Sequence, residues 1–160
     1  MGYTTAESLV WYFNLTHELI KMQLDGLTHA DSLLQLPFRG NCLNWVLGHI
    51  VGNRNTALTR LGRERVWPEE DEARYCRGSE AIVESGQALP LEELLQALDE
   101  TQEGILAALQ GIDEAELDEV VDDKRTLGES LAWLHWHETY HVGQLEILRQ
   151  LAGKDDVVIP

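Results

Sequence analysis

Apolar side chains recur at steps of three and four residues over four long segments of the chain, which is the spacing of one face of an α-helix. The predicted helices span residues 5–24, 41–61, 90–110 and 126–153. No segment of comparable length shows the strict alternation that is typical of a strand. The stripe of the first helix consists of Leu9, Phe13, His17, Ile20 and Leu24.

Residues that commonly begin and end helices support these limits. Asn41 is suited to the N-cap of the second helix, and Gly62 to the position just after its end. Pro90 falls in the first turn of the third helix, where its missing N–H costs nothing. Thr126 and Glu129 have the spacing of a capping box, so the fourth helix is predicted to begin there.

Three connections and a tail join these segments. The second connection is much longer than the other two, and a long connection is what parallel neighbours in a helix bundle require. The pattern therefore predicts an all-α four-helix bundle that forms a single domain over residues 1–160. The connections cover residues 25–40, 63–89 and 112–125, with short helical turns expected at 30–36, 69–76 and 113–118.

The composition narrows the function classes. The chain has 28 acidic and 12 basic residues and a formal net charge of −16, which argues against nucleic-acid partners and anionic membranes, because both attract clustered Lys and Arg. No apolar run approaches the roughly 18 residues that a membrane span needs, and the N-terminus lacks a signal pattern. Cys42 and Cys76 are too few for a disulfide framework. We expect a cytoplasmic protein.

Three of the six histidines lie close together in the fourth helix. His137 and His141 are one helical turn apart, so their imidazoles share a face and can share a metal ion. His135 lies about 200° around the helix from His137 and is predicted to be a surface or interface residue. His17 is expected to be a hydrogen-bonded histidine at the edge of the core, and His29 to be exposed.

A third ligand candidate, His49, lies in the middle of the second helix beside Gly48 and near Gly52. Glycine lowers helix propensity, so its presence indicates the close approach of another helix or of a ligand. Three imidazoles would leave a fourth metal position for water or substrate, whereas structural zinc sites are usually closed by four protein ligands. Imidazole suits zinc, nickel, iron and copper, and the sequence does not choose among them.

Other polar and aromatic residues lie near the candidate ligands. Asn53, Glu138 and Gln144 are within helical reach and could hold the imidazoles by their second ring nitrogens. For Gln144 the alternative is a hydrogen bond between helices. Three aromatic residues are candidates either for core packing, their commoner role, or for the lining of a pocket, namely Trp45, Trp133 and Tyr140.

The segment from His137 to His141 has the length and the His-Glu start of the zinc-protease helix motif. Glu138 stands where that motif has its general base. The protease motif is usually followed by a downstream ligand, however, and here the remaining candidate, His49, lies far upstream. A protease is therefore a minor alternative.

Two stretches resemble a known family. Residues 44–51, Asn-Trp-Val-Leu-Gly-His-Ile-Val, and the pattern His137-Glu138-x-x-His141-x-Gly143-Gln144-Leu145 are similar to the DinB-like (DinB/YfiT) family of metal-dependent enzymes. The resemblance implies a bundle of up-down-down-up topology and a homodimer. It also implies a divalent metal, often nickel or zinc, held by His49, His137 and His141. Some members of the family are transferases or isomerases that use a low-molecular-weight thiol.

These observations leave two main hypotheses for function. The first is a metal-dependent enzyme, either a thiol-dependent transferase or a hydrolase. Arg39, Arg54 and Arg60 could bind the carboxylates of a thiol cofactor, although surface solubility is their commoner role. The low basic content does not favour an anionic thiol and leaves hydrolysis by activated water. The second is a non-catalytic metal- or ligand-binding dimeric bundle with a stress-related role. A plain helical bundle with core histidines is a third.

Overall fold

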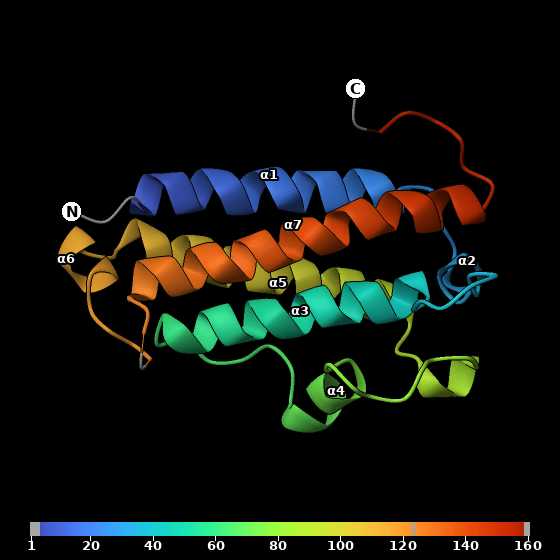
Figure 1. The fold of residues 1–160 in the computed structure, drawn as a ribbon, viewed down its shortest axis with the longest axis horizontal. Coiled ribbons are helices and arrows are strands. Elements are labelled where there is room, and N and C mark those ends of the chain that lie inside the picture. Colours follow the sequence, from blue (N-terminus) through green and yellow to red (C-terminus); the bar gives the residue numbers. More distant parts are fainter. Residues whose placement is uncertain (1–3, 123, 159–160) are drawn as a thin grey trace.

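The computed structural model describes residues 4–122 and 124–158, and this part of the chain is all-helical (Figure 1). No strand forms within it, and its one β feature is an isolated bridge between Val120 and Thr126. The four long helices are α1 (Ala6–Leu24), α3 (Leu43–Arg60), α5 (Leu91–Gln110) and α7 (Leu127–Leu151). The short ones are α2 (His29–Ser32), α4 (Glu69–Arg74), η1 (Ser85–Gln87) and α6 (Glu114–Leu117).

The helix limits agree with the sequence patterns with two exceptions. The capping box of Thr126 and Glu129 is formed at the start of α7, and Gly62 follows α3 with a φ of 68°, which favours glycine. Asn41 is not the N-cap of α3, because that position is held by Cys42. The first connection is helical over His29–Ser32 rather than over 30–36, because Thr28 forms a capping box that starts α2 at residue 29 and the helix ends at Ser32.

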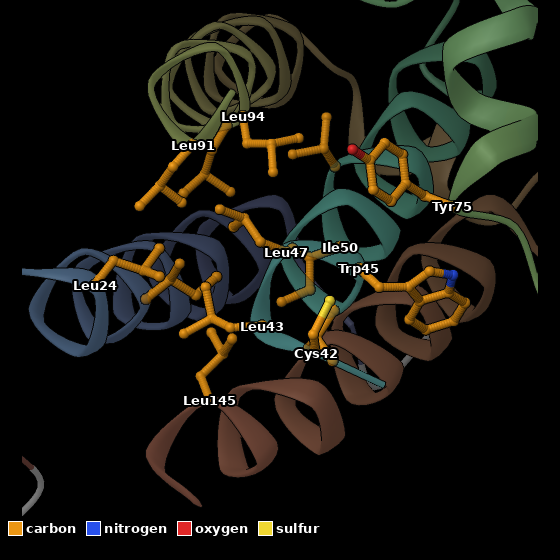
Figure 2. Close-up of a cluster of buried hydrophobic side chains, with 14 of the residues drawn as sticks. Leu24, Cys42, Leu43, Trp45, Leu47, Ile50, Tyr75, Leu91, Leu94 and Leu145 are labelled. Carbon is orange, nitrogen blue, oxygen red and sulfur yellow. The ribbon is translucent and has the colours of Figure 1, made fainter. Parts of the chain in front are cut away.

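The long helices bury their predicted apolar faces against one another. Both α1 and α3 pack against α5 and α7, and Figure 1 shows the four side by side. One cluster of buried side chains centres on α3 and includes Leu47, Ile50, Leu94 and Leu145 (Figure 2). A second includes Leu9, Phe13, Ile105 and Leu131. Within the described residues, no helix is both long and apolar enough to cross a membrane.

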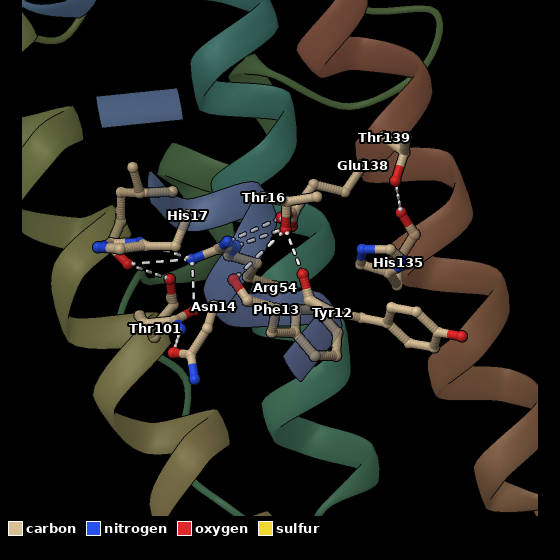
Figure 3. A network of polar contacts seen from close by, with 12 residues as sticks. Tyr12, Phe13, Asn14, Thr16, His17, Arg54, Thr101, His135, Glu138 and Thr139 are labelled. Carbon is tan, nitrogen blue, oxygen red and sulfur yellow. Dashed lines mark hydrogen bonds and ion pairs between the residues drawn. The ribbon is translucent and has the colours of Figure 1, made fainter. Parts of the chain in front are cut away.

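A charged pair is also fully buried among the helices (Figure 3). Arg54 of α3 donates two hydrogen bonds to Glu138 of α7, from Nε to Oε2 at 2.8 Å and from Nη2 to Oε1 at 2.7 Å, and both side chains are 1% exposed. Thr16 of α1 also donates to Glu138, and Gln102 of α5 accepts from Arg54. The network therefore joins all four long helices. The prediction of a surface or cofactor-binding role for Arg54 is wrong.

The pair holds Glu138 in its charged form. Burial raises the pKa of Glu138, but the charge of Arg54 and the hydrogen bonds from Arg54 and Thr16 outweigh burial and hold that pKa below its usual value. A buried carboxylate with two hydrogen-bond donors and a guanidinium partner is one that a protein interior tolerates. Glu138 therefore serves packing rather than catalysis.

Two histidines, one on α1 and one on α2, form hydrogen bonds of the kind that structural residues make. The His17 ring is half-buried, with Nδ1 3.3 Å from Arg54 Nη1 and Nε2 3.2 Å from Asp99, which confirms the prediction of a hydrogen-bonded residue at the core edge. His29 is half-buried rather than exposed, because its Nδ1 accepts a hydrogen bond from the backbone N–H of Leu91 at the start of α5. The prediction for His29 is therefore wrong.

His135, predicted to be a surface or interface residue, is half-buried where α7 meets α1. Its ring stacks on Tyr12 with centroids 5.0 Å apart and meets Phe13 edge-on at 5.6 Å. Both partners belong to α1, so His135 contributes to the packing of α7 against α1. Figure 3 shows the ring between the two helices.

The long second connection folds back over α3 and is tied to it by Tyr75. The Tyr75 side chain is buried, and its hydroxyl donates to Asn44 Oδ1 at 3.1 Å and accepts from Leu89 N–H at 2.8 Å. A Cβ on Gly48 would lie 2.3 Å from the Tyr75 ring, whereas a Cβ on Gly52 would make an ordinary 3.4 Å contact. The close neighbour of Gly48 is thus an aromatic ring of the connection rather than another helix.

Replacing Gly48 by alanine is expected to lower the free energy of unfolding by about 1–3 kcal/mol, because the Tyr75 ring must move to admit the new methyl group. Gly52→Ala is the matched control in the same helix, and its better helix propensity is expected to leave the protein unchanged or slightly more stable. Urea denaturation measures both. Equal effects of the two substitutions would contradict the role assigned to Tyr75.

Candidate metal centre

Three imidazoles from two helices meet at one point. His49 comes from α3, and His137 and His141 come from successive turns of α7. One nitrogen of each ring lies within 4.8 Å of the others, and the Nε2 atoms of His137 and His141 are 3.2 Å apart. The fold therefore brings together the two histidines selected by their spacing, His137 and His141, and the third candidate, His49.

Hydrogen bonds fix the orientation of two of the rings. His49 Nδ1 lies 2.7 Å from the backbone carbonyl oxygen of Tyr75, and His141 Nδ1 lies 2.8 Å from Gln144 Oε1. Both oxygens only accept hydrogen bonds, so each Nδ1 carries the proton and each Nε2 keeps a lone pair. A metal-binding histidine is typically held in this way, by a carbonyl or amide oxygen on its second nitrogen.

The environment keeps the imidazoles neutral. Burial lowers the pKa of His49 and of His137 below the usual value, and it lowers the pKa of His141 to about 4. At neutral pH all three rings therefore offer lone pairs rather than positive charge. Neutral imidazole is the form that binds a metal ion, and three converging neutral nitrogens fit a divalent transition metal.

The three histidines line a cavity of about 890 Å³, a volume within the usual range for small-molecule sites. Trp45 stacks on the His49 ring with centroids 4.8 Å apart and donates from Nε1 to Ser79, so it both packs in the core and lines the cavity. Trp133 and Tyr140 are 44% and 59% exposed and line the cavity without being part of the core.

The three residues that were expected to hold the imidazoles make different contacts. Gln144 bonds directly to His141, as predicted for a residue that holds an imidazole. Asn53 instead donates to the backbone oxygen of His49. Glu138 pairs with Arg54 and does not line the cavity, so the protease alternative loses its general base.

Sequence reasoning missed the contribution of Tyr75. Its backbone carbonyl holds His49, and its ring occupies the space above Gly48. A backbone acceptor in a loop leaves no residue-type signal, although the neighbouring Gly48 marked the close approach. Arg77 was also not singled out, yet it lines the cavity together with Arg39.

The protein is therefore an all-helical protein with a candidate metal centre, formed by three histidines on the wall of a cavity. The sequence matches the DinB superfamily over residues 8–145, and the chain belongs to this superfamily. The crystal structure of a conserved protein from Enterococcus faecalis is similar, with a TM-score of 0.73 and 17% sequence identity over 96% of this chain and 100% of that one. At that identity the likeness shows the fold alone. No curated protein matches the sequence.

Proposed function

We propose that this protein is a metal-dependent enzyme in which His49, His137 and His141 hold one divalent transition metal, with nickel and zinc as the first candidates. The observation that carries the proposal is the convergence of three neutral imidazole nitrogens, within 4.8 Å, on the wall of a cavity. Three protein ligands leave a position open toward a substrate. We further propose that the long helices form an up-down-down-up four-helix bundle.

Among the reactions open to such a site, we favour thiol-dependent group transfer. When bound, the metal would lower the pKa of a coordinating thiol so far that the thiol loses its proton outright, which needs no separate base. With its proton passed to water, the sulfur of such a thiol would form a bond to an electrophilic carbon as the leaving group departs with its electron pair. Hydrolysis would be helped by a general base, and no Asp or Glu of the described residues lines the cavity.

The residues of the chain would perform the remaining tasks. Gln144 and the carbonyl of Tyr75 hold the ligand rings in place. Trp45, Trp133 and Tyr140 provide apolar surface for the body of a substrate. The homodimer and the cytoplasmic location stay predictions of the sequence.

The first experiment is the metal content of the purified, untagged protein, measured by elemental mass spectrometry after reconstitution with nickel and with zinc. We expect about one metal per chain and its loss in His141→Ala. His135→Ala is the control, because His135 lies on the same helix but packs against α1, and we expect it to retain the metal. Equal metal content in the two variants would contradict the assigned ligands.

Turnover then separates an enzyme from a non-catalytic metal-binding bundle. The metal-loaded protein is assayed with low-molecular-weight thiols and electrophiles, and separately with esters and amides. Thiol consumption that depends on His141 would support the transferase. Turnover of the ester or amide alone would identify a hydrolase, and no turnover with an intact metal site would favour the stress-related binding role.

A further inference from the structure

The wall of the cavity differs in charge from the rest of the molecule. Acidic residues number 28 in a chain of 160, yet within residues 4–122 and 124–158 none of those that line the cavity is Asp or Glu. The charged residues among them are Arg39 and Arg77. Among the described residues, a strongly acidic protein therefore has a cavity wall without carboxylates and with two guanidinium groups.

The two arginines approach the cavity from separate segments. Arg39 lies in the connection that leads into α3. Arg77 lies in a loop that is tied to α3 on both sides, by the bond from His49 to the Tyr75 carbonyl and by the bond from Trp45 to Ser79. These two anchors place Arg77 on the same wall as the histidines.

Both guanidinium groups are exposed and, within the described residues, have no carboxylate at ion-pair distance. Five other arginines have such a partner, namely Arg54, Arg60, Arg65, Arg74 and Arg149. The remaining two, Arg63 and Arg125, have none among the described residues, but they do not line the cavity. In a chain with a large excess of acid, two arginines without an internal partner at one cavity are available for an anion that comes from outside.

The rest of the wall is largely apolar. Phe38, Trp45, Trp133 and Ile147 line it together with the histidines, and Arg125 lies over the Trp133 ring at 4.9 Å. A ligand that fits this wall has an apolar or aromatic body, because a fully polar molecule would lose hydration without compensation.

We propose that the cavity binds a small amphipathic anion, with a carboxylate or phosphate on Arg39 and Arg77, its apolar body on the aromatic residues and its reactive group toward the histidines. Only the last part rests on the proposed function. The net charge of the whole chain does not oppose this binding, because salt screens charges beyond about 8 Å under physiological conditions, whereas the two arginines would contact the anion directly. The low basic content of the whole chain therefore does not disfavour an anionic thiol inside the cavity.

Three probes with a phenylalkyl body and different head groups test the proposal, namely 4-phenylbutyrate, 3-phenylpropyl phosphate and the uncharged 4-phenylbutanamide, which has the shape of the carboxylate. Binding is followed by tryptophan fluorescence and by calorimetry. We expect at least one of the anions to bind about fivefold or more tightly than the amide, with a preference that weakens as salt is added. The tighter of the two anions identifies the oxygen group. Equal binding of all three probes would overturn the proposal.

Substitutions locate the anion. Arg39→Gln and Arg77→Gln are each expected to weaken anion binding severalfold and to leave amide binding unchanged. Arg63→Gln is the control, because Arg63 is exposed and does not line the cavity. Loss of the anion preference in the control variant, or its survival in the Arg39→Gln/Arg77→Gln double variant, would overturn the proposal.

The same titrations on metal-free and metal-loaded protein separate this inference from the proposed function. A preference that persists in the metal-free protein and depends on the arginines supports the inference, even if no metal binds and the enzymatic proposal fails. A preference that needs the metal and ignores the arginines would place the anion on the metal and would overturn the inference while leaving the metal site intact.

Discussion

Replacing Arg54 by methionine is expected to lower the free energy of unfolding by about 3–5 kcal/mol, because the change leaves the Glu138 carboxylate buried without its cation. Both side chains are 1% exposed, so water cannot replace the lost partner. Of the hydrogen bonds to Glu138, the one from Thr16 would remain. Without Arg54, burial would raise the pKa of Glu138 above its usual value. Urea denaturation at neutral pH measures the loss.

The double variant Arg54→Met/Glu138→Leu tests whether the loss comes from the stranded charge. Removal of both partners removes the desolvated carboxylate, so the double variant is expected to recover most of the stability lost in the single one. Arg74→Met is the control for an exposed pair, since Arg74 pairs with Asp71 at the surface and such pairs contribute about 1 kcal/mol or less. A double variant no more stable than Arg54→Met would contradict this account.

The buried pair also bears on the metal centre, because it joins the two helices that carry the histidines. Arg54 follows His49 by five residues on α3, and Glu138 lies between His137 and His141 on α7. The bidentate contact sets the position of α3 along α7. The Arg54→Met/Glu138→Leu variant is expected to keep most of the stability of the fold. It can therefore show whether the pair also positions the three imidazoles.

The sequence was enough to predict the helices and the histidine cluster, because both follow from local spacing. Periodicity located the four long helices, and the i, i+4 step selected His137 and His141. His49 was identified from its place in the middle of a second helix, beside a glycine. The topology of the bundle, the identity of the metal and the homodimer are not local properties of this kind, and they stay predictions.

The errors concern partners that are far apart along the chain. Arg54 was predicted to have a surface or cofactor-binding role because its partner Glu138 is 84 positions away. No spacing rule connects the two residues. His135 was predicted to be a surface or interface residue from its angle to His137 alone, and the sequence did not indicate that α1 packs against that side of α7. The charge of the cavity wall could not be inferred from the net charge, since Arg77 arrives there through a folded loop.

Acidification from pH 7.5 to pH 5 is expected to lower the free energy of unfolding of the metal-free protein by about 2 kcal/mol through His141 alone. The pKa of His141 is lowered by burial from its ordinary 6.5 to about 4 in the folded chain. Above pH 6.5 the histidine is neutral in both states, so the full stability is present. Between pH 6.5 and 4 the unfolded chain binds a proton that the folded chain does not, so stability falls as the pH falls.

The other histidines with a lowered pKa add to this loss in the same direction, namely His17, His49, His135 and His137. Glu138, whose folded pKa lies below its usual 4.5, loses its contribution only at still lower pH. Burial raises the pKa of Glu72, so Glu72 opposes the loss, and the comparison with His141→Ala isolates the histidine. Urea denaturation of the metal-free protein at pH 7.5 and 5 measures the loss, and His141→Ala is expected to show the smaller pH dependence. Stability that is flat across this range, or equally steep in the variant, would show that His141 becomes protonated within the folded protein, and the three rings would then not be the neutral donors that a metal requires.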